Sequence, residues 1–192
     1  MALAIAAQML AGGSLAAQGE GPLIAAPHEV KAAFLVKFLG YTEWPQTSFE
    51  RTDSPLRIVV LGDPDVAAAL EEVARRQPGI HGHPLEISYH RLPNRALREG
   101  DPQIEAARQA HAVYVEGDDP ERAARLLGLL GRDDVLTIGA HAEFCVSGGM
   151  IALREQGRRI VFDANASAIR ESSLQVSARV LQLARVVSPG SS

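Results

Sequence analysis

Short apolar runs alternate with longer amphipathic segments along most of the 192-residue chain. The short runs are rich in β-branched and apolar residues, as strands are, and they lie at 56–61, 85–89, 112–115 and 135–138. The longer segments repeat apolar residues every three or four positions, as helices with one buried face do, and they lie at 30–41, 64–76, 104–110 and 120–130. This alternation predicts an α/β fold of three layers, in which helices flank both faces of a mostly parallel sheet.

The pattern changes near the C-terminal end of the sequence. Two strands, at 149–153 and 158–162, flank a polar turn from Arg154 to Gly157. A tight turn between two strands predicts a hairpin, so we expect the sheet to gain antiparallel strands at one edge. Apolar residues three or four positions apart then predict a single closing helix from Ser173 to Val187.

Residues 1–17 form an apolar run that ends in small residues. Because Ser14-Leu15-Ala16 fits the small-x-small cleavage pattern, the run predicts a signal peptide and therefore export. No basic segment precedes it, so a plain apolar leader remains the alternative. After it we expect a linker at 18–27, one folded domain at 28–187 and a disordered tail at 188–192.

The composition narrows the class of protein. Hydrophobic residues make up 46% of the sequence, which is enough for one domain with a substantial core. The formal net charge is -4, and this mildly acidic balance gives no electrostatic basis for binding nucleic acid. Cys145 is the only cysteine, so an internal disulfide is excluded and a buried, inert thiol is expected.

Two segments, taken together, are similar to one known family. The first combines Val30-Lys-Ala-Ala-Phe34 with Glu43-Trp44-Pro45. The second contains Gly148-Gly-Met-Ile151, continues through Arg159-Ile-Val-Phe-Asp-Ala-Asn165 and ends in Leu181-Gln-Leu-Ala184. In this order the motifs resemble the YfiR family of exported proteins, and the resemblance covers nearly all of the chain after the leader.

The resemblance implies a regulatory function exerted by binding. The best-known member of the family is a periplasmic repressor that holds the periplasmic region of a membrane-bound diguanylate cyclase, and its release raises cyclic-di-GMP. By this resemblance we expect a periplasmic protein whose partner is such a cyclase or a related sensor protein. An outer-membrane lipoprotein and a second copy of the chain are the further partners that the resemblance implies. The alternative is a periplasmic small-molecule-binding module that serves another membrane receptor.

The sequence departs from the family pattern in two places. Ala110 stands where relatives often have a cysteine, so redox control through an internal disulfide is not expected. Gly139-Ala140-His141 stands where many relatives have a Ser-Asp pair, so a ligand contact made by that aspartate does not carry over.

The candidate partner- or ligand-binding residues follow the strand at 135–138, and they are Phe144, Cys145, Gly148, Gly149 and Met150. They are chosen by their position alone. The two adjacent glycines have two readings, and the sequence leaves both open. They let a ligand or a partner backbone approach closely, or they form a bulge that turns the strand.

Catalysis finds little support in the sequence. Cys145 shares a loop with His141, but the flanking Phe144 and Val146 make an apolar setting that raises a thiol pKa. Ser147 lacks the preceding glycine of a nucleophile elbow. We therefore expect no catalytic residue and no cofactor.

A metal site is not expected either. His81-Gly82-His83 is the only close pair of histidines, and it has no acidic or thiol ligand in register. His111 and His141 are expected to be structural. Trp44 is expected to pack the first helix against the sheet in preference to facing a partner.

Overall fold

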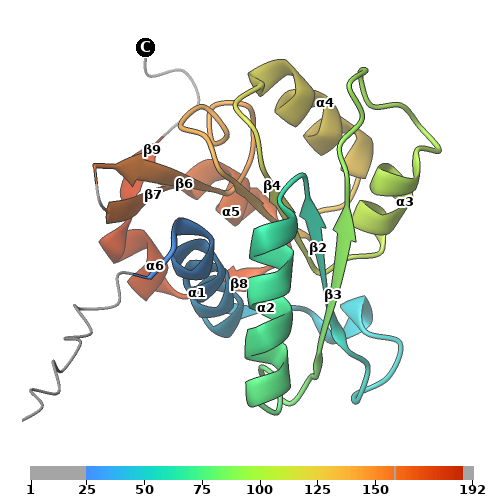
Figure 1. Ribbon diagram of the computed structural model, residues 1–192. Coiled ribbons are helices and arrows are strands. Elements are labelled where there is room, and N and C mark those ends of the chain that lie inside the picture. Colours follow the sequence, from blue (N-terminus) through green and yellow to red (C-terminus); the bar gives the residue numbers. More distant parts are fainter. Residues whose placement is uncertain (1–24, 158, 188–192) are drawn as a thin grey trace, which may run out of the picture.

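The computed structural model describes residues 25–157 and 159–187, and their central element is a twisted sheet (Figure 1). Within these residues, seven strands form one sheet in the order β3-β2-β4-β5-β6-β7-β9, and two short strands pair separately. The strands of the large sheet are β2 (Leu56–Leu61), β3 (Leu85–His90), β4 (Ala112–Val115), β5 (Leu136–Gly139), β6 (Ile151–Gln156), β7 (Arg159–Asn165) and β9 (Arg185–Val187). The separate pair is β1 (Thr42–Glu43) with β8 (Gln175–Val176).

Helices cover both faces of this sheet, which confirms the predicted three-layer α/β fold. One face carries α1 (Pro27–Gly40), α2 (Pro64–Arg76), α5 (Ala166–Glu171) and α6 (Ala178–Leu183). The other carries α3 (Pro102–Arg108), α4 (Pro120–Leu130) and the loop at 140–150. Figure 1 shows α1 and α2 side by side in front of the sheet, with α3 and α4 at its other side.

Alternate residues along the central strands serve the two cores. In β2, Ile58 and Val60 face the α1 and α2 side, whereas Val59 and Leu61 face the α3 and α4 side. The same alternation holds in β4, because successive side chains of a strand point to opposite faces. Strands buried on both faces therefore read as continuous apolar runs.

Aromatic side chains pack α1 against strand β7, on the same face of the sheet. Phe38 meets Phe162 of β7 edge to face at a ring-centroid distance of 5.0 Å, and Phe34 lies 5.8 Å from the same ring. Trp44 is buried, and its indole Nε1–H donates to the carbonyl of His111 at 3.0 Å. The expectation that Trp44 has a structural role is thus confirmed.

The predicted hairpin is present, with different boundaries. β6 and β7 are antiparallel, but the strand begins at Ile151 and not at residue 149. Residues 154–156, predicted as part of the turn, continue the strand by pairing with residues 159–161. The hairpin also does not form the edge, because β9 pairs with β7 in parallel and lies outside it.

The single closing helix predicted from Ser173 to Val187 is wrong. Only Ala178–Leu183 is helical, Val176 pairs with Thr42, and Arg185–Val187 is a strand beside β7. The apolar spacing is helical, but strand partners on β1 and β7 offer the backbone hydrogen bonds that a longer helix would make internally. Tertiary pairing therefore overrides the local pattern.

The predicted signal peptide at 1–17, most of the predicted linker and the tail at 188–192 lie outside the described residues. Of the helices within 25–157 and 159–187, none has the length and apolar character that a bilayer span requires.

Replacing Phe38 by alanine tests the contact between α1 and the sheet. We expect the free energy of unfolding to fall by about 3–5 kcal/mol, because the change removes a fully buried aromatic ring and leaves a cavity. Lys37→Ala is the matched control on the same helix, since Lys37 is exposed, and it should change stability by less than about 0.5 kcal/mol. Urea unfolding of both variants measures the difference, and equal losses would contradict this packing.

Candidate functional site

The loop at 140–150 holds all five candidate binding residues and joins two parallel neighbours, β5 and β6. Parallel strands are usually joined by a crossover helix, but this connection contains turns and no helix. Four of the five residues are buried, namely Phe144, Cys145, Gly149 and Met150, whereas Gly148 is exposed. Phe144 and Cys145 pack in the core on the α3 and α4 face, so the loop covers that face as a helix would, whereas Met150 belongs to the core on the other face.

The ring of Phe144 lies between two glycines. A Cβ atom added at Gly139 would lie 2.2 Å from the ring, and one added at Gly149 would lie 2.1 Å from it. Of the two readings of the glycine pair, close approach therefore holds at Gly149, but the approaching group is a side chain of this chain. Gly148 has a φ of +101°, which side chains rarely adopt, so it serves as the turn.

Polar groups fasten this loop at its middle and at its C-terminal end. The hydroxyl of Thr137 accepts from the backbone N–H of Met150 at 3.1 Å, and the amide of Asn165 donates to the carbonyl of Cys145 at 3.0 Å. The other side-chain atom of Asn165 accepts from two N–H groups at the start of α5, where it is the N-cap. One buried asparagine thus ties the loop to the helix that follows β7.

The Cys145 thiol is held in an apolar and inert state. Its Sγ lies 3.7 Å from the carbonyl oxygens of Met150 and Asp163. Burial raises the thiol pKa to about 12, so the nucleophilic thiolate is absent at neutral pH. The ring of His141 meets Phe144 edge to face at 5.6 Å, and burial lowers its pKa.

An ion-pair cluster around a buried carboxylate joins the three C-terminal strands of the sheet, and no spacing pattern in the sequence indicates it. The carboxylate of Asp163 on β7 has no exposed surface. It accepts from Arg154 of β6 at 2.8 Å and from Arg185 of β9 at 2.7 Å. Burial by itself would raise the pKa of Asp163, but the two guanidinium groups outweigh it and the net effect lowers the pKa.

A second polar cluster lies at the carboxyl ends of β2 and β4. Lys31 of α1 donates to Glu116 at 3.0 Å and lies 3.9 Å from Asp63. The hydroxyl of Tyr114 also donates to Glu116. Asp63 caps α2 by accepting from the N–H groups of Asp65 and Val66. These charges pair with one another, so the cluster holds α1 against the sheet.

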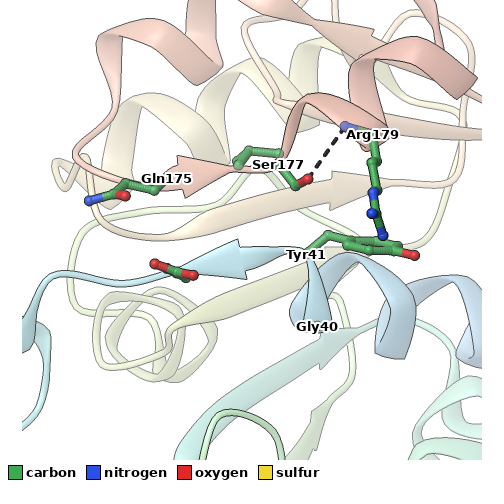
Figure 2. Close-up of a pocket in the computed structure, with 7 residues that line it drawn as sticks. Gly40, Tyr41, Gln175, Ser177 and Arg179 are labelled. Atoms are coloured by element: carbon green, nitrogen blue, oxygen red, sulfur yellow. Dashed lines mark hydrogen bonds between the residues drawn. The ribbon is translucent and has the colours of Figure 1, made fainter.

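A cavity of about 450 Å³ opens between the end of α1 and the β1–β8 pair (Figure 2). Figure 2 shows the side chain of Arg179 extending toward the ring of Tyr41, beside Ser177. The hydroxyl of Ser177 accepts from the N–H of Arg179 as the N-cap of α6. Seven residues line the cavity: Gly40, Tyr41, Glu43, Gln175, Val176, Ser177 and Arg179. The sequence did not indicate this cavity, because the helix predicted from Ser173 to Val187 includes the residues of β8 and so excludes its pairing with β1.

The histidines do not converge on a metal. Within 25–157 and 159–187, no three potential ligands among His, Cys, Asp and Glu lie together. His83 is buried and bonds the carbonyl of Ser54 at 2.7 Å, whereas His81 is exposed. His111 has partners at both ring nitrogens, as expected of a structural histidine, but the buried Nε2 of His141 has no partner among the described residues.

Comparison with known proteins gives two findings. A family model described as YfiR/HmsC-like matches residues 28–185. A solved structure of a conserved domain protein from Vibrio cholerae O1 biovar El Tor is similar over 84% of this chain, with a TM-score of 0.54 and 14% sequence identity. This chain spans 60% of the length of that protein, and at this identity the likeness shows the fold alone.

The variant Gly149→Ala tests the packing of the Phe144 ring against Gly149. We expect a loss of stability of about 1–3 kcal/mol or more, because the new methyl group overlaps the ring. Gly128→Ala is the matched control, since nothing lies within 4 Å of its added Cβ and alanine favours the interior of α4. The midpoint temperature of thermal unfolding should therefore fall for Gly149→Ala and stay the same or rise for Gly128→Ala. An unchanged midpoint for Gly149→Ala would contradict the contact between Gly149 and Phe144.

The state of the Cys145 thiol is tested by labelling with a disulfide reagent at pH 8. The native protein should react far more slowly than a free thiol, because burial raises its pKa to about 12. The urea-unfolded protein serves as the control, and its thiol should react at once, with one equivalent of the reagent consumed per protein chain. Rapid labelling of the native protein would contradict the buried, neutral thiol.

Proposed function

The chain belongs to the YfiR/HmsC-like family, and from this membership we propose that it is an exported regulator that restrains a membrane-bound diguanylate cyclase through its periplasmic region. The family is known for a periplasmic repressor of such a cyclase, and its members are regulatory proteins not known as enzymes. The match over residues 28–185 is the observation that carries this proposal. The outcome of binding is a lower output of cyclic-di-GMP.

The chemistry of the described residues supports binding in preference to catalysis. The thiol of Cys145 is neutral and buried, and the carboxylate of Asp163 is neutralised by two arginines. The Lys31 ammonium group is likewise paired with acidic side chains. A nucleophile with an adjacent base, which covalent catalysis requires, does not occur at these three places.

We place the partner surface at the β9 edge of the sheet. Leu183 is 76% exposed and Val186 is 52% exposed, and both are large apolar side chains. β9 ends the strand order, so its outer side has no neighbouring strand among the described residues. Exposed apolar side chains beside an open strand edge favour association with another protein.

The loop at 140–150 extends this surface. Asn165 pairs with Val187 of β9 and also binds the carbonyl of Cys145, so the loop adjoins the end of the strand. Val146, which follows, is 60% exposed, and Gly148 is exposed as well. The candidate residues thus divide by role. Gly148 remains a proposed contact, and the four buried ones shape the loop that presents it.

Restraint of the cyclase follows from differential affinity. A regulator that binds the inactive conformation more tightly shifts the population of the cyclase toward that conformation. Any effector that weakens the complex reverses the shift. An outer-membrane lipoprotein or a second copy of the chain that covers the same apolar edge would compete with the cyclase in this way.

A small-molecule-binding module is the second proposal, and the cavity beside α1 favours it. The cavity has an acidic and a basic side chain in its lining, Glu43 and Arg179, together with the ring of Tyr41. A ligand that binds only the folded state raises the unfolding midpoint. A thermal-shift screen with the wild-type protein and Arg179→Ala therefore separates ligand binding at this cavity from partner binding at the β9 edge.

The double variant Leu183→Asp/Val186→Asp tests the partner surface. We expect its affinity for the periplasmic fragment of the cyclase to fall about 10- to 100-fold, because two charges would enter an apolar contact. Intracellular cyclic-di-GMP should rise for this variant, and it should rise to the same extent on deletion of the gene. Tyr89→Asp is the control, since Tyr89 is 40% exposed on the opposite edge strand, β3.

Two results would contradict the proposal in different ways. If the gene deletion leaves cyclic-di-GMP unchanged while the protein is expressed in the parent strain, restraint of a cyclase is wrong. If the deletion raises cyclic-di-GMP but the double variant still represses, only the assignment of the β9 edge is wrong.

A further inference from the structure

Three aromatic rings, one of them from the segment 46–55, stack at the amino ends of the strands. Phe49 lies between His83, at a centroid distance of 3.9 Å, and His111, at 4.5 Å. The interplanar angles are 7° and 20°, so both faces of Phe49 are covered. Both histidines are buried. The segment that contains Phe49 therefore packs through this ring against two buried histidines.

The hydrogen bonds of His111 fix one neutral tautomer. The backbone N–H of Arg57 in β2 donates to Nδ1 at 2.9 Å, so Nδ1 must be an acceptor. Nε2 lies 3.0 Å from the carbonyl of Ser48, which can only accept, so Nε2 carries the proton. A second proton would have to enter at Nδ1, where it would face another N–H donor. Protonation therefore removes the bond to Arg57 and places two donors against each other.

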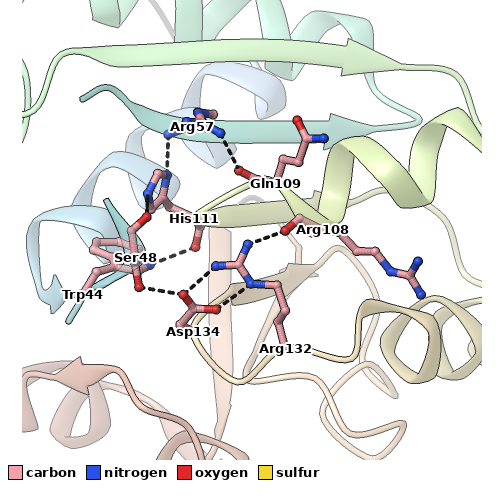
Figure 3. A network of polar contacts seen from close by, with 8 residues as sticks. All are labelled: Trp44, Ser48, Arg57, Arg108, Gln109, His111, Arg132 and Asp134. Carbon is pink, nitrogen blue, oxygen red and sulfur yellow. Dashed lines mark hydrogen bonds and ion pairs between the residues drawn. The ribbon is translucent and has the colours of Figure 1, made fainter. Parts of the chain in front are cut away.

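The charges around His111 do not compensate for a second proton. Figure 3 shows the ring between the ends of β2 and β4, with Ser48, Arg57 and Trp44 around it. The Arg57 guanidinium, which lies 3.3 Å from Glu50, and Arg132 oppose a positive ring, and Asp134 favours it. Asp134, however, is already paired with Arg132 and accepts from the hydroxyl of Ser48 at 2.6 Å. Burial is the largest cause that lowers the pKa of His111 below its ordinary 6.5.

We propose that the segment 46–55 is a latch that acid releases through protonation of His111. In the neutral state the ring accepts from Arg57, donates to Ser48 and stacks on Phe49, so it joins the segment to β2. Protonation removes the first of these contacts and sets Nδ1–H against the N–H of Arg57, so the ring turns away from β2 and gives up its contacts with Ser48 and Phe49. The inference concerns the amino end of the sheet and does not depend on the partner surface at β9.

The direction of the pH effect follows from the lowered pKa of His111. The unfolded or released state takes up a proton near pH 6.5, before the closed state does. The free energy that favours the closed state is therefore greatest above about pH 6.5. It falls as the pH drops from there toward the pKa of His111 in the closed state, and below that pKa it no longer changes. His83 serves as an internal contrast. Its Nδ1 donates to the carbonyl of Ser54, and a proton added at Nε2 leaves that bond intact.

Release has a structural consequence at a neighbouring cavity. A cavity of about 180 Å³ lies against Trp44, Phe49, Ile80 and His83. Movement of the segment would withdraw Phe49 from this cavity, which the Trp44 indole also lines. The indole, whose Nε1–H is bonded to the carbonyl of His111, would then gain contact with solvent.

Trp44 is the single tryptophan of the chain and reports on this change without any mutation. Its fluorescence should shift toward that of a solvated indole between pH 7.5 and pH 5. Hydrogen exchange of residues 46–55, corrected for the intrinsic effect of pH, should accelerate roughly tenfold for each pKa unit that separates the two states of His111. Helix α4, which lies on the far side of the sheet, should keep its protection.

Two variants decide whether His111 is the group that responds. His111→Asn keeps an acceptor near the position of Nδ1 but cannot be protonated, so its exchange should not depend on pH over this range. His83→Asn should retain the response of the wild-type protein. If the first variant does not fold, the wild-type fluorescence and exchange still decide the matter. Unchanged protection of residues 46–55 at pH 5, or a full response in His111→Asn, would overturn the latch.

Discussion

The contact between Phe144 and its two glycines supports the C-terminal half of this fold. β5 and β6 are parallel neighbours, and a connection without a helix would leave one face of the sheet uncovered. Phe144 supplies that cover, and the ring fits only because Gly139 and Gly149 have no Cβ. The loop places β6 in register with β5, and the hairpin partner β7 follows from β6. The last strand, β9, is then added to β7.

The β9 edge shows how a short strand is secured at the end of a sheet. Three residues make few backbone hydrogen bonds, so the pairing of Arg185 with the buried Asp163 supplements them. Removing one partner of a buried ion pair lowers the free energy of unfolding by more than the intact pair contributes to it, because the remaining charge is buried without a counter-charge. The same strand carries the exposed Val186, so the element that we assign to the partner is anchored on one side and open on the other.

The two ends of the sheet have different polar chemistry. At the carboxyl end, Lys31 forms ion pairs with the carboxylates of Asp63 and Glu116. At the amino end, the segment 46–55 depends on a neutral histidine, which is the side chain whose charge changes most readily near pH 6. A response confined to one end of the sheet would let the protein change locally without unfolding.

Much of the fold follows from the sequence because local and tertiary preferences agree there. The apolar runs at 56–61 and 112–115 are strands, and the amphipathic segments at 64–76 and 104–110 between them contain helices. The family could also be identified from motifs, since these positions serve the core and the turns. Where a residue has one strong local preference and the fold satisfies it, the pattern alone is sufficient.

Tertiary structure alone decided the parts where a local pattern had a competing partner. The helical spacing at 173–187 gave way to strands because β1 and β7 offered unpaired backbone groups. The glycine pair was interpretable only once Phe144 was seen against Gly149, a contact that spacing does not encode. The stack of His83, Phe49 and His111 joins residues far apart in the chain, so no local pattern could indicate it. Sequence determines what each segment prefers, and the positions of its neighbours in space decide which preference prevails.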